Sequence, residues 1–360
     1  MEEVKEGLEG VVAFRTEIAE PDREGGSLRY RGVDIEELVG SKPYEQVWGL
    51  LVDESFLPGL EPADPYELRD ASGAAMPDLQ GATARLSAEW GLGKLIDIGD
   101  EQAKQDLRRL SATMISIVAQ SARVADGETT RVDRRTIEEG ETTAARFLLE
   151  WRGVADPKCV KAIDTYWICT AEHGMNASTF AARVVASTGA DCGAALSSAV
   201  GALSGPLHGG APARVLPMLD GAAAAPSVEQ YVKELLDGKQ RLMGFGHRVY
   251  RAEDPRARLL RRTAQELGSP RFEIAEELER VALEELAERH PERVLATNVE
   301  YWSAVVLDVA EIPPDLTPAM FGCSRTGGWS AHILEQKRTG RLIRPSAVYV
   351  GPSSRPLAGV

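Results

Sequence analysis

The chain of 360 residues has few aromatic residues: Phe, Trp and Tyr make up 6% of it, although hydrophobic residues make up 43%. Strands are enriched in aromatic and β-branched residues, whereas Ala and Leu, which supply much of the apolar content here, are strong helix formers. The composition therefore favours helices over a β-sandwich or a barrel. An apolar fraction of this size also excludes an intrinsically disordered chain.

Long apolar runs, a leader and paired cysteines are also lacking. No apolar run reaches the roughly 18 residues of a membrane span, and Met1-Glu2-Glu3-Val4-Lys5 lacks the basic and apolar regions of a secretory signal. We therefore expect a cytoplasmic protein without a membrane partner. The cysteines show no CxxC spacing, so we expect reduced, mostly buried thiols. They are Cys159, Cys169, Cys192 and Cys323.

Positive charge is the scarcer kind in this chain. The 41 Lys and Arg residues do not balance the 55 Asp and Glu residues, which leaves a net charge of −14 at pH 7. Such a charge repels the phosphates of nucleic acids and the headgroups of anionic lipids. We therefore expect neither a nucleic acid nor a membrane surface as a partner.

The length exceeds what one hydrophobic core usually organises, since single cores stop growing near ~250–300 residues. The composition changes at residues 221–226, a Gly-Ala-Ala-Ala-Ala-Pro segment, and again at residues 312–315, Ile-Pro-Pro-Asp. These changes predict a large helical domain formed by residues 1–220 and 313–360. A smaller helical domain, residues 221–312, is then inserted between its two parts.

The exception to a helical chain lies near its start. Val12-Ala13-Phe14 and Leu28-Arg29-Tyr30 flank a turn-forming segment that holds Pro21 and two glycines, which predicts a small β-hairpin. Elsewhere apolar residues recur at the spacing of a helix face, as in residues 103–125. We therefore predict an all-α protein with a small N-terminal β-hairpin.

Capping residues mark the starts of several helices in the second half of the chain. Ser227 and Asp254 are typical N-caps, and Pro255 is typical of a first helical position. Two further helices are predicted at residues 272–289 and 298–310 from their apolar period.

Only five histidines occur, and glycine flanks two of them: Gly205-Pro206-Leu207-His208-Gly209 and Gly244-Phe245-Gly246-His247. Such glycines let a backbone approach a ligand closely and leave an imidazole accessible. The histidines form no HxxxH pair, so a zinc site is the weaker interpretation and we expect no metal. His290 and His332 are expected to be structural.

Basic residues gather in one segment of this acidic chain. Residues 239–262 hold eight of them against Glu253 and Asp254, a local charge of +6. Such a run is either a solvated helix face or a site for a compact polyanion, such as a nucleotide cofactor or a di-acid. Its position around His247 favours the anion site.

Proton abstraction beside two histidines would need a carboxylate. Glu300, in Asn298-Val299-Glu300, comes at the start of an apolar helix, where burial would raise its pKa. It could equally be a helix-terminal Glu that interacts only with the macrodipole. Asp308, further along the same helix, is a competing candidate.

Several motifs together resemble the citrate synthase family, in particular the short dimeric type found in archaea and many bacteria. They are Leu28-Arg29-Tyr30-Arg31-Gly32-Val33-Asp34, Glu172-His173-Gly174-Met175-Asn176-Ala177-Ser178-Thr179, Gly205-Pro206-Leu207-His208-Gly209-Gly210-Ala211, Gly244-Phe245-Gly246-His247-Arg248-Val249-Tyr250-Arg251 with Asp254-Pro255-Arg256, and Arg344-Pro345-Ser346-Ala347. The resemblance implies an all-helical two-domain fold, a homodimer, and condensation of acetyl-CoA with oxaloacetate and water to citrate and CoA. It implies no cofactor, because the coenzyme A thioester is a substrate.

The resemblance also implies roles for individual residues. His208 would stabilise the enolate of acetyl-CoA, His247 would polarise the oxaloacetate ketone, and Glu300 would be the general base. The remaining roles are substrate binding: His173, Arg256, Arg325 and Arg344 for oxaloacetate, with Arg344 reaching across the dimer interface, and Gln240, Arg241, Leu242, Met243, Gly244 and Arg251 for coenzyme A.

The chain departs from the family pattern at the base. The family has an Asp in an Asn-Val-Asp motif, whereas Glu300 carries one more methylene, which moves the carboxylate by about 1 Å. Three alternatives therefore stay open: a 2-methylcitrate synthase that uses propionyl-CoA, a lyase or hydrolase acting on citryl-CoA, and a non-catalytic homologue that binds CoA or a di-acid.

Overall fold

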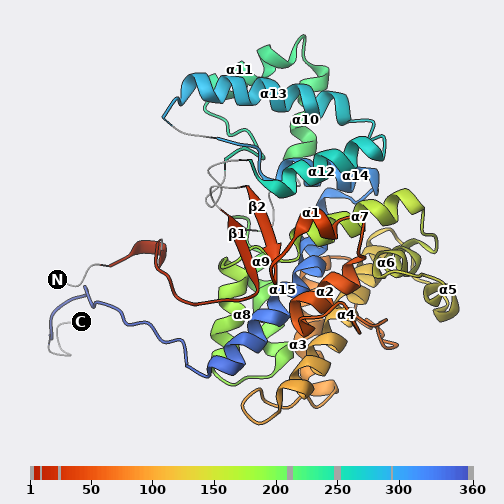
Figure 1. Cartoon of the computed structure of the whole chain (residues 1–360), viewed down its shortest axis with the longest axis vertical. Coiled ribbons are helices and arrows are strands. Elements are labelled where there is room, and N and C mark those ends of the chain that lie inside the picture. Colours follow the sequence, from red (N-terminus) through yellow and green to blue (C-terminus); the bar gives the residue numbers. More distant parts are fainter. Residues whose placement is uncertain are drawn as a thin grey trace.

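The computed structural model describes residues 4–8, 10–22, 26–208, 214–246, 253–292 and 295–355. These ranges contain fifteen α-helices, two short 3-10 turns, η1 (Glu6–Leu8) and η3 (Pro314–Leu316), and one small sheet (Figure 1). Within them, no helix is both long enough and apolar enough to cross a membrane. The prediction of an all-α protein with a small N-terminal β-structure is confirmed.

The sheet has three antiparallel strands in the order β1 (Ala19–Asp22), β2 (Ser27–Tyr30) and β3 (Val33–Asp34). The predicted hairpin is present, but the predicted position of its first strand is wrong. Residues 12–14 are irregular, and the strand lies next to the turn, with Pro21 opposite Leu28. Proline is tolerated there because β1 is an edge strand, which needs hydrogen-bond donors on one side only.

The helices fall into two groups in Figure 1. The lower group contains α1 (Ile35–Leu38), α2 (Tyr44–Asp53), α3 (Ala75–Glu89), α4 (Asp100–Ala125), α5 (Arg134–Glu138), α6 (Thr143–Arg152), α7 (Pro157–Thr170), α8 (Ala177–Ser187), α9 (Cys192–Leu203) and α15 (Thr317–Thr339). The upper group contains α10 (Val215–Ala224), α11 (Val228–Asp237), α12 (Pro255–Glu266), α13 (Phe272–Arg289) and α14 (Val299–Val309). Helices α12 and α14 pack against each other and also against α7. The division into domains at residues 221–312 stays a prediction.

The capping residues act as the sequence predicts. Ser227 accepts a hydrogen bond from the Gln230 N–H at 3.2 Å and begins α11. Asp254 accepts from the Arg256 N–H at 3.0 Å, with Pro255 as the first residue of α12. The predicted bounds of α13 agree with the structure, and α14 lies within residues 298–310.

Helix α15 is the element that the lower group surrounds. It packs against α2, α4, α7, α8 and α9, and residues 322–334 are all buried. Three of the four cysteines are buried as predicted, Cys159 is half-buried, and all four are free thiols. Because α15 is buried on every side, each polar residue on it needs a partner from a neighbouring helix or a ligand.

Candidate active site

One face of α15 carries a buried arginine. Arg325 follows Phe321 by four residues, so both side chains lie on the same face, and the guanidinium carbon is 4.7 Å from the centre of the Phe321 ring. Arg325 is 3% exposed, and its Nε donates to the Thr170 carbonyl at 2.6 Å. Its Nη1 is buried without a hydrogen-bond partner in the described part of the chain. This free donor on a buried cation is suited to an anionic ligand.

His208 lies beyond the end of α9, beside the same face of α15. Its ring is edge-on to Phe321, with 6.3 Å between the ring centres, and its Nε2 is 2.9 Å from Ser178 Oγ. Burial and then the Arg325 charge lower the pKa of His208 to about 4. The imidazole is therefore neutral at neutral pH.

Ser178 holds the ring of His208 from the start of α8. Its hydroxyl donates to Asn176 Oδ1 at 2.8 Å and accepts from the Trp329 indole N–H at 3.1 Å. These two bonds fix the oxygen that His208 contacts. No role for Ser178 was predicted, although the residue lies within the Glu172–Thr179 motif.

Arg256 is held by a neighbouring carboxylate at the start of α12. Its Nε and Nη2 donate to the two oxygens of Asp254 at 2.9 and 2.7 Å, and both side chains are almost fully buried. Asp254 also accepts from the Val299 N–H at 3.1 Å. This one carboxylate thus joins the first turns of α12 and α14, a role that its sequence pattern as an N-cap did not reveal.

Glu300 lies in the first turn of α14. Burial raises the pKa of its carboxyl group, while the positive charges of Arg256 and Arg241 act in the opposite direction. A desolvated carboxylate with a raised pKa is a stronger proton acceptor than an exposed one. Asp308, the competing candidate, instead lies at the far end of α14 and forms an ion pair with Arg271 at 3.0 Å.

A short antiparallel pairing places the start of α14 beside residues 244–246. The Asn298 N–H donates to the Gly244 carbonyl at 2.9 Å, and the Gly246 N–H donates to the Ala296 carbonyl at 2.8 Å. Gly244 has a φ of +88°, and a Cβ there would lie 2.6 Å from Tyr301 Cβ. Glycine is therefore required for this close approach. His247 and Arg251, which follow, lie outside the described residues.

The structure describes most of the predicted catalytic and oxaloacetate-binding residues. Electrostatic interactions connect several of them, whereas Arg344 lies apart from the others. The charge of Arg325 acts on His208, the charge of Arg256 acts on Arg325, and Arg256 also acts on Glu300. His173 is half-buried in the turn between α7 and α8. Arg344 is exposed on the tail that follows α15, and about 20 Å of helix separate Arg325 from that tail.

The residues predicted to face coenzyme A differ in exposure. Gln240 and Arg241 are exposed and Met243 is half-buried, whereas Leu242 is 8% exposed and belongs to the core. The side chain of Leu242 is thus turned into the protein, which leaves mainly its backbone for a ligand. The assignment of these residues to coenzyme A stays a prediction.

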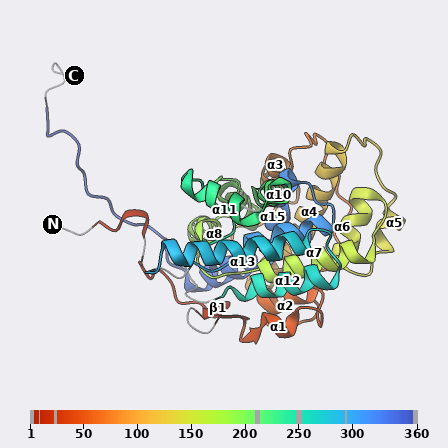
Figure 2. The same cartoon turned by 90° about the horizontal axis from the view of Figure 1, so that it is seen from above.

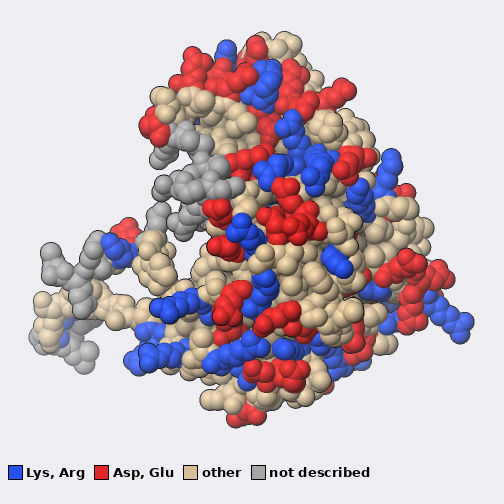
Figure 3. All heavy atoms as spheres, in the orientation of Figure 1, with Lys and Arg blue, Asp and Glu red and all other residues tan. Residues whose placement is uncertain are grey.

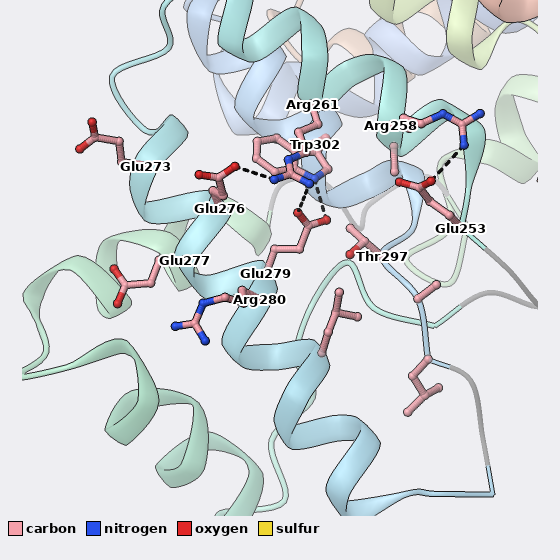
Figure 4. A pocket seen from close by; sticks show the side chains of 14 residues that line it. Glu253, Arg258, Arg261, Glu273, Glu276, Glu277, Glu279, Arg280, Thr297 and Trp302 are labelled. Carbon is pink, nitrogen blue, oxygen red and sulfur yellow. Dashed lines mark hydrogen bonds and ion pairs between the residues drawn. The ribbon is translucent and has the colours of Figure 1, made fainter.

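The basic segment is less open than its sequence implies. A cavity of about 830 Å³ lies beside α12 and α13. Arg258 pairs there with Glu253 at 3.0 Å and Arg261 with Glu276 at 2.5 Å, and Figure 4 marks both ion pairs. None of the predicted catalytic residues that the structure describes lines this cavity. Figure 3 likewise shows acidic and basic side chains close together on the upper group. Part of the run is therefore a solvated, ion-paired face.

The described residues also contain no group of His, Cys, Asp and Glu side chains arranged to hold a metal ion. His290 is exposed, and His332 is completely buried between Glu172 and Arg183.

Comparison with known proteins agrees with this arrangement. The family model described as "Citrate synthase, C-terminal domain" matches residues 7–346. The chain is 58% identical to a Mycobacterium tuberculosis protein named "Putative citrate synthase 2" over 97% of this chain and 93% of the relative. It is 36% identical to a citrate synthase of Haloferax volcanii over 97% of this chain and 96% of that protein.

Solved structures show the same fold. A citrate synthase of Thermoplasma acidophilum, in a ternary complex with carboxymethyl coenzyme A and oxaloacetate, superimposes with a TM-score of 0.85 at 28% identity and covers 100% of both chains. A citrate synthase of Pyrobaculum aerophilum gives a TM-score of 0.82 at 32% identity and covers 99% of this chain and 95% of that one. The chain belongs to the citrate synthase family, whose members are condensing enzymes of the transferase class.

The role of Asp254 can be tested by stability. Asp254→Asn removes the carboxylate charge that pairs with the buried Arg256 guanidinium, and breaking a buried ion pair typically costs about 3–5 kcal/mol. We expect a loss of this size in the free energy of unfolding, measured by urea denaturation. Glu253→Gln is the control, because Glu253 is an exposed neighbour, and we expect a change within about 0.5 kcal/mol. Equal effects of the two substitutions would contradict the role of Asp254.

Proposed function

We propose that this chain is a citrate synthase, which condenses acetyl-CoA with oxaloacetate and water to give citrate and CoA. The observation that carries the proposal is that a neutral, half-buried His208 lies beside Arg325, while a desolvated carboxylate, Glu300, lies near Arg256. Two buried arginines near an acid–base pair suit a di-acid and a weakly acidic carbon. The ternary complex of the Thermoplasma acidophilum enzyme supports this choice of substrates.

In the first step Glu300 takes a proton from the methyl group of the thioester. Negative charge then develops on the thioester oxygen, and His208 stabilises it by donating its one ring N–H, which contacts Ser178 Oγ when no thioester is bound. A neutral imidazole is suited to this task because it can donate a proton without carrying a charge into the buried site. The raised pKa of Glu300 favours the transfer, since the carboxylate is a stronger base.

The enolate carbon then attacks the ketone of oxaloacetate. His173, Arg256 and Arg325 hold the carboxylates of oxaloacetate, and His247 polarises its ketone. The Nη1 of Arg325 has the free donor that a carboxylate requires. Hydrolysis of the citryl thioester completes the reaction and releases citrate and CoA. We assign no cofactor and no metal to the reaction, and coenzyme A is assigned to Gln240, Arg241, Leu242, Met243, Gly244 and Arg251.

We further propose a homodimer in which the C-terminal tail completes the partner's site. Residues 341–355 run away from the body in both views of the molecule (Figures 1 and 2). Exposed apolar side chains, among them Val350 at 91% and Tyr349 at 78%, would lose their contact with water against a second copy. Arg344 on this tail would then reach the oxaloacetate of the other subunit.

Two further assignments belong to the proposal. Residues 221–312 form the smaller domain, and its movement toward the larger one would exclude water during the reaction. The protein acts in the cytoplasm, where free thiols such as those of the four cysteines stay reduced.

The extra methylene of Glu300 bears mainly on which acyl donor the enzyme prefers. Release of free CoA should be measured with oxaloacetate and acetyl-CoA, and in parallel with propionyl-CoA. We expect a higher kcat/KM with acetyl-CoA. A higher value with propionyl-CoA would identify a 2-methylcitrate synthase, and release without oxaloacetate would indicate a hydrolase. Binding without turnover of either donor would indicate a non-catalytic homologue.

Glu300→Gln tests the base. Gln keeps the shape of the side chain but cannot accept the proton, so kcat should fall by about 10²–10⁴-fold. Binding of both substrates should be retained in calorimetry, and exchange of the acyl α-hydrogens with solvent should fall in parallel. Asp308→Asn is the matched control and should leave kcat unchanged. Near-normal turnover of Glu300→Gln would remove Glu300 as the base.

Mixed dimers test the position of Arg344. Arg344→Ala and Glu300→Gln should each be nearly inactive alone. If Arg344 serves the partner, a mixed dimer has one site with both native residues. Random pairing makes half of the dimers mixed, so about a quarter of the wild-type activity should return. If Arg344 serves its own subunit, no mixed dimer has a complete site and activity stays absent.

A further inference from the structure

A second buried carboxylate lies next to the proposed oxaloacetate site. Glu172 is completely buried in the turn between α7 and α8, one residue before His173. Tyr30 holds the same turn. Its hydroxyl donates to the Glu172 carbonyl at 3.1 Å and accepts from the Glu172 N–H at 3.3 Å. The proposed catalytic steps assign no role to the negative charge of Glu172.

The partner of Glu172 is a histidine whose proton position is determined by a third residue. His332 Nε2 lies 3.1 Å from Glu172 Oε1, and His332 Nδ1 lies 2.9 Å from Arg183 Nη1. A guanidinium can only donate, so Nδ1 must accept and the ring proton must be on Nε2. His332 therefore donates to Glu172 and cannot turn its acceptor nitrogen toward it.

Two further residues of α15, Glu335 and Gln336, hold the guanidinium of Arg183 in place. Its Nη1 donates to Glu335 Oε2 at 2.6 Å and its Nε donates to Gln336 at 3.1 Å. The guanidinium carbon also lies 4.2 Å from the centre of the Phe14 ring. A chain of contacts thus runs from the N-terminal segment through Arg183 and His332 to Glu172.

Helix α15 leaves space for the carboxylate by means of a glycine. A Cβ at Gly328 would lie 2.1 Å from Glu172 Oε2 and 2.5 Å from the Ala171 carbonyl oxygen. Arg325, Gly328 and His332 follow one another at helical spacing and share a face of α15. Glu172 therefore lies over Gly328, between an arginine and a histidine of the same helix.

The charge of Glu172 acts on the arginine that the mechanism needs. Burial acts to raise the pKa of Glu172, but His332 and then Arg325 outweigh it, so that the pKa lies below its usual value. Glu172 Oε2 and Arg325 Nη1 are both buried without a hydrogen-bond partner among the described residues. The carboxylate is thus an anion that offsets the buried cation without occupying its free donor.

We propose that Glu172 is a positioning residue for oxaloacetate, held by His332 and Gly328, which orients the His173 turn and balances the charge of Arg325. This inference rests on the proposed function, because it assigns a role within the same site. Removing the anion leaves Arg325 uncompensated in a buried site, and the loss falls on the substrate that Arg325 binds and not on the acyl donor.

The first experiment compares Glu172→Gln with the wild-type enzyme. Gln must present its oxygen to the His332 N–H, so its NH₂ group replaces the oxygen that offsets Arg325. We expect the KM for oxaloacetate and its Kd by calorimetry to rise by about 10-fold or more, with the KM for acetyl-CoA within about twofold of wild type. A purely structural role predicts a lower Tm with both KM values unchanged, which would overturn the proposal. Absence of CoA release by the wild-type enzyme would instead refute the proposed function.

Controls and coupling sharpen the result. His332→Leu should reproduce part of the rise in oxaloacetate KM, because it removes the hydrogen bond that holds the Glu172 carboxylate in place. The double variant should add little to the effect of Glu172→Gln alone, because no charge is then left for His332 to position. The exposed pair of the same residue types, His290 and Glu292 at 3.8 Å, provides the controls His290→Leu and Glu292→Gln. These should change neither KM. Full additivity in the double variant would contradict action through one contact.

Gly328→Ala keeps the proposal testable if the Glu172 variant does not fold. Ala is the better helix former, which offsets part of the cost, yet its methyl group must displace both the Glu172 carboxylate and the Ala171 carbonyl of the same turn. We expect oxaloacetate KM to rise by about 10-fold here too, with acetyl-CoA KM little changed. An unchanged oxaloacetate KM in folded Gly328→Ala would show that the position of Glu172 is immaterial to binding.

Discussion

The structure depends on the burial of α15, a helix that is surrounded on all sides and still carries charge. An unpaired charge inside a protein is costly, so each polar residue on such a helix must have a partner at a fixed place. Arg325 donates to the Thr170 carbonyl, and His332 is held between Glu172 and Arg183. These requirements fix α7 and α8 relative to α15, and the turn between those two helices carries His173.

The same burial gives the two proposed catalytic groups their complementary character. Removal from water disfavours whichever protonation state is charged, so it lowers the pKa of an imidazole and raises that of a carboxyl group. His208 is therefore neutral and Glu300 is a stronger base than in water. Desolvation alone shifts the pKa values of both residues in the direction that enolate formation requires, so the two residues do not need different surroundings.

The sequence predicts local features well where a side chain acts on its own backbone. The predicted N-caps Ser227 and Asp254 mark real helix starts, since a cap acts within three residues. The first strand was misplaced because apolar alternation at residues 12–14 carries no information about its pairing partner. Pairing depends on both segments together, and residues 19–22 are the ones that pair with β2.

The candidate site was predictable only in part, because local sequence again carries no information about partners that are distant in the chain. Glycine-flanked histidines and the family resemblance predict His208, Arg256, Arg325 and Glu300, and the charges of the two arginines act on His208 and Glu300. The roles of these residues stay a prediction. Two residues beside this group were missed, because their partners are distant in sequence: Ser178 contacts His208, and the charge of Glu172 acts on Arg325. Asp254 was recognised only as a cap, since nothing local indicates that its second oxygen pairs with Arg256 and also accepts from α14.

Arg344 differs in its surroundings from the other arginines assigned to oxaloacetate. The other arginines assigned to oxaloacetate are almost fully buried, where each has a defined partner, whereas Arg344 lies on an exposed tail with apolar neighbours. An arginine that binds a di-acid strongly must lose water and freedom of movement when it does so. The tail of a single subunit provides neither condition. If Arg344 belongs to the site, the surface that orders it must come from a second copy, so that assembly of the dimer and completion of the oxaloacetate site are the same event.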